Sequence, residues 1–330
     1  MTKRVGISIV NYRTGQLVIE CLQSLIAIFD TLPYSLSVVV VDNLSPDDSV
    51  AKLSEFLAQS PAKHWINLIA APKNGGFSYG NNIAVKKLLT ENCDYIWLLN
   101  PDTRVLPNAC EALIDCLNAN PTAAIAGSAL QDPDGTQQIA SFNFPTVWGE
   151  LVSSSGLAVL AKKFPASIIA RPIPTERCRV DWVAGASMMI TTQAIKEVGL
   201  MDENYFLYFE EVDYCRTFHQ AGYDTLFEPA SKVIHLVGAA TGISNTRKQA
   251  PRRPAYWFHS RCYFFQKNYG FFNALIADKL GGLGYIIYRL KLILKGEVYL
   301  GPPYFLYDFI RHSSFFCGNL VKAANKKRSA

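Results

Sequence analysis

The sequence lacks the glycine-rich turns with which two large classes of nucleotide-binding protein hold phosphate. No G-x-G-x-x-G follows the first apolar run, and no G-x-x-x-x-G-K-[ST] is present. The first absence excludes the dinucleotide turn of nicotinamide enzymes, and the second excludes the nucleoside triphosphatase loop. A diphosphate ligand would need another counter-charge, such as a Mg²⁺ ion bound by one or two carboxylates.

The sequence also lacks paired cysteines and long apolar runs. None of its eight cysteines forms a Cys-x-x-Cys pair, and we therefore expect free, buried thiols in a reducing compartment. No apolar stretch is long enough for a signal peptide or a membrane-spanning helix. We expect a cytoplasmic protein that, at most, contacts a membrane surface.

Charge of one sign is not in large excess. The 32 Lys and Arg residues exceed the 27 Asp and Glu residues by five, in a chain of which 49% is hydrophobic. This composition is typical of a globular protein. The mild positive excess permits an anionic ligand or membrane surface, and we expect no nucleic-acid partner.

Short apolar runs alternate with amphipathic helical patterns in the first part of the chain. Such alternation indicates βαβ units, so we predict an α/β fold with a mainly parallel, Rossmann-like sheet and helices on both faces. The predicted strands are 5–10, 36–41, 66–70, 95–99 and 123–126, and the predicted helices are 16–29, 47–58, 77–89 and 107–117.

The second part of the chain is less regular. Residues 129–180 have weak periodicity and predict loops and an insertion. Regular structure is expected to return at 180–191, with a helix at 210–220 and further strands at 223–227 and 232–235. From residue 255 onward the pattern is aromatic, basic and helical.

Polar residues follow each of the first four predicted strands. In an open parallel sheet, ligands bind beyond the carboxyl ends of the strands, so these residues predict a binding site. Helix capping and turn formation are the alternative explanations, because Asn, Asp and Gly favour both. The residues are Asn11 and Tyr12, then Asp42, Asn43 and Ser45, then Lys73 and Asn74, then Asn100 and Asp102.

A second cluster, YFLYFEEVDYCR at 205–216, combines aromatic residues with the carboxylates Glu210, Glu211 and Asp213. Apolar surroundings raise the pKa of a carboxylate, which suits a general base. The alternative is that the acids only stabilise the N-terminus of a helix. His235 follows another apolar run, and on its own such a histidine is more often structural than a ligand.

Taken together, these segments resemble the family 2 glycosyltransferases of the GT-A fold, and in particular the bacterial rhamnosyltransferase-like branch that builds cell-surface polysaccharides. The resemblance covers residues 4–241 and continues into RPAYWFHSRCYFFQKNYG. The matching segments are SIVNYRTG, VVVVDNLSPDDS, NGGFSYGNN, YIWLLNPDT, VAGASMMI, MDENYFLYFEEVDYCRTFHQAGY and VIHLVGAAT.

The resemblance implies a role for each matching residue. Asp102 corresponds to the second acid of the Asp-x-Asp metal motif, and His235 to the histidine that joins a Mg²⁺ or Mn²⁺ site. Glu211 takes the position of the general base, beside Glu210 on the acceptor side. The residues implied in donor binding are Asn11, Asp42, Lys73, Asn74, Asn82, Asn100 and Asp102.

Two residues depart from the family pattern. Asn100 replaces the first Asp of the metal motif and leaves less negative charge for the cation. Glu211 stands where Asp is usual, so Glu210 or Asp213 could share the role of base. The resemblance implies residues 1–250 as the catalytic domain, which binds a nucleotide sugar, and 251–330 as a helical region that meets the acceptor or a membrane.

The implied activity is inverting, metal-dependent transfer of a sugar, with rhamnose from dTDP-rhamnose as the first expectation. The acceptor would be a hydroxyl of a growing, lipid-linked polysaccharide, or an oligosaccharide, in cell wall biogenesis. A UDP-hexose or UDP-galactofuranose donor and a non-catalytic nucleotide-binding partner subunit are the alternatives. Oligomerisation stays open. A sugar nucleotidyltransferase would need a Gly-rich, basic loop after the first strand, and VNYRTGQL does not supply one.

Residues 255–327 mix aromatic and basic side chains. Ordinary packing of helices would account for this pattern. The functional alternative is an interfacial surface that meets a lipid-linked acceptor at the inner leaflet of the membrane.

Overall fold

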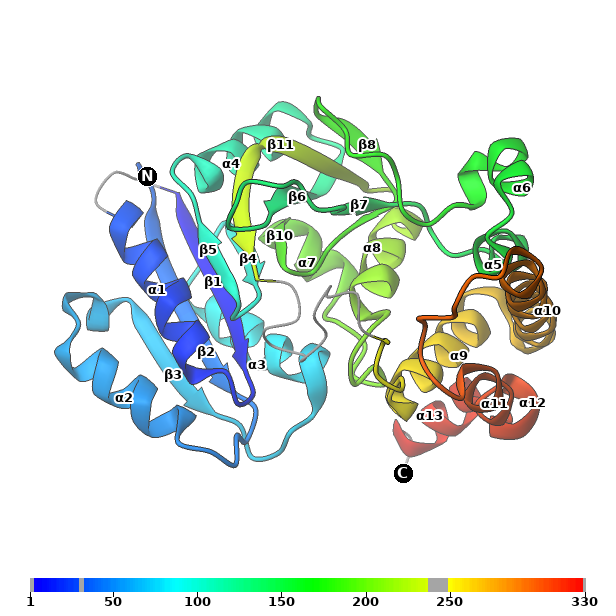
Figure 1. Cartoon of the computed structure of the whole chain (residues 1–330). Coiled ribbons are helices and arrows are strands. Elements are labelled where there is room, and N and C mark those ends of the chain that lie inside the picture. The colour runs from blue at the N-terminus through cyan, green and yellow to red at the C-terminus, as the bar shows by residue number, and fades with distance from the viewer. Residues whose placement is uncertain (1–2, 30–32, 237–248, 329–330) are drawn as a thin grey trace. The chain divides into compact units, whose positions relative to one another are not determined.

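The computed structural model describes residues 3–29, 33–236 and 249–328, and they form two compact units (Figure 1). The N-terminal unit comprises residues 1–142, 172–203 and 211–244. The C-terminal unit comprises residues 143–171, 204–210 and 245–330. The chain thus passes between the units several times.

The N-terminal unit is built on a nine-stranded sheet with the order β3-β2-β1-β4-β10-β6-β11-β5, to which β8 adds beside β11. Pairs β1–β2, β2–β3, β1–β4 and β6–β11 are parallel, whereas β10 is antiparallel to β4 and β6. The strands are β1 Arg4–Asn11, β2 Ser35–Asp42, β3 Ile66–Ala70, β4 Tyr95–Leu99, β5 Thr103–Val105, β6 Ala123–Gln131, β8 Cys178–Val180, β10 Ser187–Thr191 and β11 Asp224–His235. A separate ribbon pairs β7 Ser141–Phe142 with β9 Trp182–Val183.

Helices cover both faces of this sheet (Figure 1). The chain moves outward from β1 to β3 and then returns to β4 beside β1, so right-handed connections place α1 and α2 on one face and α3 on the other. This reversal makes the gap between β1 and β4 the switch point at which α/β proteins bind ligands. The helices are α1 Gly15–Phe29, α2 Ser49–Gln59, a 3₁₀ turn Pro61–His64, α3 Gly76–Thr90, α4 Ala109–Ala119, α7 Thr192–Val198 and α8 Glu210–Gln220.

The central strands form because their residues are apolar on both sides. All five residues of β4 are buried, and Trp97 at its centre is fully enclosed. Strands β1 and β2 are buried from their second residue onward. A strand covered on both faces needs a continuous apolar run rather than an alternating one, and this explains why these runs were recognisable in the sequence.

The predicted α/β fold with a C-terminal helical region is confirmed, with three local differences. Residues 129–180, expected to be loops, contain α5, α6 and short strands. The two strands expected at 223–227 and 232–235 are one strand, β11, with a register shift between Glu228 and Lys232. Strand β5 was not predicted, because three residues are too few to show a period.

The C-terminal unit is helical. Its helices are α5 Val147–Ser155, α6 Ala158–Lys163, a 3₁₀ turn Pro165–Ser167, α9 Ala255–Tyr269, α10 Phe271–Lys295, α11 Phe305–Arg311, α12 Ser314–Cys317 and α13 Leu320–Arg328. Helices α5 and α10 approach closely at Gly284, where a Cβ atom would lie 2.9 Å from the carbonyl oxygen of Leu151. Residues 143–171 therefore belong with the C-terminal helices, which the expected division at residue 250 does not capture.

Arg261 on α9 holds this helical unit together. Its guanidinium donates to Glu150 Oε2 on α5, at 3.0 Å from Nε and 2.5 Å from Nη2, and to Asp278 Oδ1 on α10 at 2.6 Å. Asp278 Oδ2 in turn accepts from the backbone N–H of Ser314 on α12 at 2.7 Å. The Arg261 side chain is only 4% exposed, so one buried cation neutralises the buried acid Asp278 and the largely buried acid Glu150.

We predict that Arg261→Met destabilises the C-terminal unit by about 3–5 kcal/mol, because it leaves the buried carboxylate of Asp278 and the largely buried carboxylate of Glu150 without their counter-charge. The matched control is Lys295→Met, which breaks an ion pair with Glu297 in which both side chains are more than half exposed, and a loss of at most about 1 kcal/mol is expected there. Urea unfolding followed by circular dichroism measures both. Equal losses in the two variants would show that burial of Arg261 adds nothing.

Candidate active site

The carboxyl ends of β1 and β2 meet through Asn11 and Asp42, which lie opposite each other in the parallel register. Asn11 Nδ2 donates to Asp42 Oδ1 at 2.6 Å, and Asp42 Oδ2 accepts from the backbone N–H of Ser45 at 2.9 Å. Both side chains are buried. The structure therefore brings these two predicted donor-binding residues together, and it uses them to fix the loop that follows β2.

Two residues of this edge adopt left-handed backbone conformations without being glycine. Arg13, after β1, has φ of 60°, and Leu44, after β2, has φ of 58°. The backbone N–H of Arg13 donates to Ser45 Oγ at 2.9 Å, which ties the two loops together. Non-glycine residues with positive φ are uncommon and gather at functional sites, so this is independent support for a binding edge.

The loop after β3 contributes Lys73 and Asn74. Lys73 is exposed, with Nζ 4.8 Å from the centre of the Tyr79 ring. Asn74 Oδ1 accepts from the backbone N–H of Gly76 at 3.2 Å, which is the turn alternative that the sequence left open. The loop joins the same edge, since Asn43 Nδ2 donates to the Gly76 carbonyl at 2.8 Å.

Asn82 on α3 is engaged with the protein itself. Its Nδ2 donates to the carbonyl of Met201 and to Glu203 Oε1, both at 2.9 Å, and its Oδ1 accepts from the Met201 N–H at 3.1 Å. The side chain is buried. Direct contact of Asn82 with a donor stays a prediction, and this bonding favours a positioning role instead.

Asp102 and His235 are brought together by the antiparallel pairing of β5 with β11. His235 lies opposite Thr103 in the register, and the N–H of Leu236 donates to the Asp102 carbonyl at 2.9 Å. His235 Nε2 then lies 3.5 Å from Asp102 Oδ1, and the two side chains are 16% and 3% exposed. That separation is longer than the 2.7–3.2 Å typical of an N–H···O hydrogen bond.

Gln138 determines which imidazole nitrogen faces Asp102. Its Nε2 donates to Asp132 Oδ1 and to the His235 carbonyl, both at 2.8 Å, so its Oε1 is the atom left to meet His235 Nδ1 at 3.2 Å. An amide oxygen only accepts, and Nδ1 must therefore donate. In the neutral imidazole, Nε2 then presents a lone pair to the Asp102 carboxylate.

Two electron-pair donors that face each other at this distance fit a shared cation. Asp102 would supply a carboxylate oxygen and His235 an imidazole nitrogen, a donor set that suits Mg²⁺ or Mn²⁺ with water or phosphate oxygens completing the shell. Gln138 would orient His235 as a ligand, because it accepts a hydrogen bond from the ring nitrogen that faces away from Asp102. Asn100 directly follows β4, at the start of the turn that contains Asp102 and leads to β5. Its carbonyl accepts from Thr103 Oγ1 at 2.7 Å.

Glu211, near the start of α8, lies in the same region of the N-terminal unit. A Cβ atom placed on Gly185 would be 3.5 Å from the Cβ of Glu211, and the carbonyl of Ala186 accepts from the N–H of Asn100 at 3.0 Å. Burial raises the pKa of the Glu211 carboxyl. Its Oε2 atom is buried and has no hydrogen-bond partner among the residues described. The buried carboxylate of Glu211 therefore lies close to the residue that follows β4, with Gly185 and Ala186 between them.

The other two acids of the cluster are placed differently. Asp213 is two residues from Glu211 on α8, so the two side chains leave the helix about 200° apart, and a shared role as base is disfavoured. Glu210 belongs to the segment 204–210 of the C-terminal unit. The catalytic roles of Glu210 and Asp213 stay predictions.

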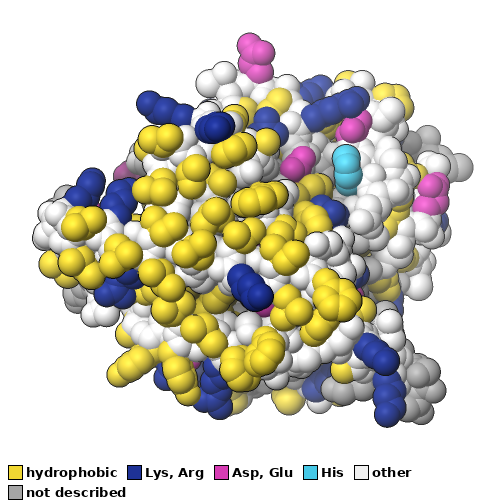
Figure 2. All heavy atoms as spheres, turned by 90° about the vertical axis from the view of Figure 1, so that its right-hand side faces the viewer, with side chains coloured by type: hydrophobic (Ala, Val, Ile, Leu, Met, Phe, Trp, Pro, Cys, Tyr) yellow, Lys and Arg dark blue, Asp and Glu magenta, His cyan; other side chains and the backbone are white. Residues whose placement is uncertain are grey.

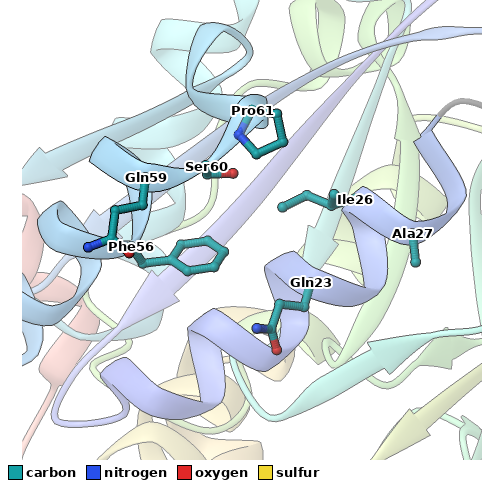
Figure 3. Close-up of a pocket in the computed structure, with 7 residues that line it drawn as sticks. All are labelled: Gln23, Ile26, Ala27, Phe56, Gln59, Ser60 and Pro61. Atoms are coloured by element: carbon teal, nitrogen blue, oxygen red, sulfur yellow. The ribbon is translucent and has the colours of Figure 1, made fainter.

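The hollows of the N-terminal unit differ in chemistry. One of about 190 Å³ is lined by Arg13, Thr14 and Asp47 and adjoins the loops after β1 and β2. A larger one of about 410 Å³ lies between α1 and α2, near the ends of these helices (Figure 3). There Ile26 and Phe56 lie on facing helices, and none of the described residues that line it is titratable. This hollow lies near the start of β2, whereas Asp42 lies at the end of that strand.

Sequence reasoning identified the ends of the strands but missed Gln138. Its signal was hidden because residue 138 lies in the irregular stretch between 129 and 180. The bonds that orient it come from Asp132 and from the backbone of His235, which is 97 residues away. The VGAAT part of the matching segment VIHLVGAAT lies outside the described residues.

We predict that Gln138→Leu weakens Mn²⁺ binding about 10–100-fold, because it removes the hydrogen bond that orients His235 as a ligand. Electron paramagnetic resonance of free Mn²⁺ measures this affinity directly. Gln137→Leu, at an exposed neighbouring position, is the matched control and should bind like the parent. Unchanged affinity in Gln138→Leu would contradict the assigned tautomer and the cation site built on it.

Comparisons with known proteins give the family and the fold that this chain resembles. Residues 6–162 match the family model described as glycosyl transferase family 2. The chain is 26% identical over 223 residues to an N-acetylglucosaminyl-diphospho-decaprenol L-rhamnosyltransferase of Mycobacterium tuberculosis, covering 62% of this chain and 68% of the relative. It is also 26% identical over 207 residues to the rhamnosyltransferase WbbL of Escherichia coli, covering 59% and 76%.

Solved structures support the fold. GalNAc-T7 with UDP, GalNAc and Mn²⁺ superposes with a TM-score of 0.56 at 17% identity, over 84% of this chain and about half (51%) of that one. The mannosyltransferase PcManGT of Pyrobaculum calidifontis, in complex with GDP-Man and Mn²⁺, gives a TM-score of 0.56 at 13% identity, over 90% and 76%. Residues 6–162 therefore form a glycosyltransferase family 2 domain, the chain has the GT-A fold, and it resembles the rhamnosyltransferase branch of that family.

Proposed function

We propose that this glycosyltransferase inverts the sugar that it transfers, in one displacement, from a nucleotide diphosphate donor to an acceptor hydroxyl. The observation that supports this most strongly is the short path between the two halves of the site. Asp102 and His235 form the cation site after β4, and Glu211 reaches the same strand end through Gly185 and Ala186. A cation site beside a buried base is the arrangement that direct displacement requires.

Each of the proposed site residues has a defined task in this mechanism. Asn11 and Asp42 shape the loops that would receive the nucleoside, with Lys73 and Asn74 beside them. A divalent cation bound by Asp102 and His235 would supply the positive charge that stabilises the leaving diphosphate. The Glu211 carboxylate accepts the proton of the acceptor hydroxyl as the oxygen attacks the anomeric carbon from the face opposite the leaving group.

Rhamnose from dTDP-rhamnose is the proposed donor, supported by the names of two relatives that share 26% identity with the chain. One alternative is a UDP-hexose or UDP-galactofuranose donor. The other alternative is a non-catalytic nucleotide-binding partner subunit. These alternatives separate in a single panel, because bound ligand stabilises the fold by mass action whether or not it reacts.

We expect one nucleotide sugar of the panel to raise the unfolding temperature with Mn²⁺ and to be hydrolysed slowly or transferred. Glu211→Gln should lose transfer by about 10²–10⁴-fold while the donor still stabilises it. As the pH is lowered, transfer by the parent should begin to fall before the pH reaches the ordinary Glu pKa near 4.3. The reason is that burial raises the pKa of Glu211, which must be ionised to act as a base.

The stability of Glu211→Gln provides the control for folding. The raised pKa means that Glu211 contributes stability below its ordinary pKa and loses that contribution as the pH rises through the folded-state value. The glutamine variant should therefore be at least as stable as the parent at neutral pH. Donor binding without turnover in the parent would favour the non-catalytic subunit, and loss of donor binding in the variant would contradict a role as base.

We further propose that the acceptor is lipid-linked and that the C-terminal unit meets it at an anionic membrane surface. Fifteen of the 32 Lys and Arg residues lie between residues 245 and 330, against three of the 27 Asp and Glu residues. This excess of positive charge favours the anionic inner leaflet. Among the helices described, none is both long and apolar enough to cross a bilayer.

The same unit exposes an apolar face, defined by the outward residues of α10. Exposed positions recur at intervals of three, four or seven residues and so form a stripe along one side of the helix. Figure 2 shows hydrophobic side chains gathered over one face of the molecule, with Lys and Arg side chains among them and around it. The stripe consists of Phe272, Ile276, Leu283, Ile286, Leu290, Ile293 and Leu294.

Lysines border this stripe where a headgroup phosphate would meet it. A hollow of about 460 Å³ is lined by Leu290, Leu294, Lys291 and Lys295 together with Leu157 and Ile287. Apolar side chains bordered by cations are typical of a helix that lies in the interface plane of a bilayer. The partner that we propose for this face is an anionic phospholipid bilayer.

We predict that Ile293→Ser combined with Leu294→Ser weakens binding to vesicles of phosphatidylglycerol and phosphatidylcholine by about tenfold or more, because roughly 1–3 kcal/mol of apolar burial is lost. Ile139→Ser, a half-exposed position of the N-terminal unit, is the control and should bind like the parent. Flotation of vesicles measures both. Unchanged flotation of the double variant, or equal flotation with phosphatidylcholine alone, would count against this face.

A further inference from the structure

Two histidines and a cysteine of the C-terminal unit converge at one point. His259 lies on α9, His312 directly follows α11, and Cys317 ends α12. One ligand atom from each lies within 4.8 Å of the others. The centres of the two imidazole rings are 5.0 Å apart. These residues have no part in the catalytic site, which the N-terminal unit provides.

The ligand atoms of this cluster are not used elsewhere. Among residues 3–29, 33–236 and 249–328, no side-chain hydrogen bond or ion pair involves the imidazoles of His259 and His312 or the thiol of Cys317. The nearby carboxylate of Asp308 is instead occupied by Arg252, which it binds through both oxygens at 2.7 and 2.8 Å. Within the part of the chain that the structure describes, the ligand atoms that converge here are therefore nitrogen and sulfur.

The backbone around the cluster is held from one face of α9. His259, Cys262 and Gln266 are spaced by three and four residues and so share that face. Cys262 Sγ lies 3.3 Å from Ser314 Oγ, and Gln266 donates to the Gly318 carbonyl at 2.9 Å. These two contacts fix α12 on either side of Cys317, which limits how far its thiol can move from His259.

We propose that His259, His312 and Cys317 bind a zinc ion. Two imidazoles and a thiolate are among the ligands that zinc prefers, and such a three-ligand site leaves a fourth tetrahedral position for water. Zn–N bonds of about 2.0–2.1 Å and Zn–S bonds of about 2.3 Å place ligands roughly 3.5 Å apart. Rotation of the partly exposed His259 and His312 side chains would bring the present spacing to that value.

The bound ion would connect α9 with the segment that contains α11 and α12. This connection is independent of sugar transfer, so its failure and that of the proposed function are distinguishable. Zinc binding releases the thiol proton and couples metal affinity to the fold of this unit. We therefore expect zinc to stabilise the C-terminal helices.

Spectroscopy of the untagged, full-length chain tests this without any variant. After removal of metal with a chelator, Co²⁺ is added in the presence of excess Mg²⁺, a hard cation that prefers the carboxylate of the proposed site at Asp102 to a thiolate. A thiolate-to-cobalt charge-transfer band and tetrahedral d–d bands are expected, and zinc should abolish both. Absence of the charge-transfer band would overturn the proposal, because Cys317 must then be unbound.

Variants assign the site to its residues. Cys317→Ser, His259→Ala and His312→Gln should each lose about one equivalent of tightly bound zinc, measured by elemental analysis after gel filtration. They should also lose the rise in unfolding temperature that zinc gives the parent. Cys178→Ser and His64→Ala, at positions in the N-terminal unit, are the matched controls and should keep both. Zinc retained in full by the three variants would also overturn the proposal.

Discussion

The pairing of β11 with β5 is the constraint on which the proposed cation site depends. It sets His235 beside Asp102 across a three-residue strand, and Gln138 then turns the lone pair of the imidazole toward the carboxylate. In the neutral tautomer that Gln138 favours, an imidazole lone pair and a carboxylate oxygen face each other in a largely buried region. A divalent ion bound between them would accept both electron pairs, and this is how a proposed site of two protein ligands would favour a metal.

The same site stores a second cost in the carboxyl of Glu211. An ionised carboxylate with a buried, unpartnered oxygen is unfavourable in the folded chain, and the raised pKa reports this. The backbone just before it is also unusual, since Tyr208 and Phe209 both adopt positive φ, at 70° and 67°. Two consecutive non-glycine residues in this region cost on the order of 1–3 kcal/mol each. Strain and desolvation thus coincide at the start of α8, as expected where function opposes stability.

How much of this could be predicted from sequence differs between local and long-range features. Asn11, Asp42 and Asp102 were recognisable because each ends an apolar run, and parallel topology brings the ends of such runs to one edge. The antiparallel insertion of β10 between β4 and β6 was not recognisable, because a buried strand shows no direction in its composition. Gln138 was hidden for a related reason: its role depends on a histidine far away in the chain, and its own surroundings have no period.

The division into two units shows the same limit. Residues 143–171 are separated from α9 by more than eighty residues, yet Glu150 is one of the two acids that neutralise Arg261. No local pattern could assign this segment to the C-terminal helices, because the assignment depends on a buried charge that must be balanced. What the sequence did indicate was the aromatic and basic character of the last region, since composition requires no knowledge of contacts.

The distribution of charge connects the proposal of a lipid-linked acceptor with the proposal that the C-terminal unit contacts an anionic membrane. The chain as a whole has a net charge of only +5, although residues 245–330 are strongly basic, so the remainder of the chain must be net acidic. A uniform charge would attract or repel an anionic bilayer without orienting the protein. Opposite charges on different parts instead favour approach by the basic helices, because the membrane repels the acidic remainder. The apolar stripe of α10 belongs to the basic part, so electrostatic attraction and apolar burial act on the same surface.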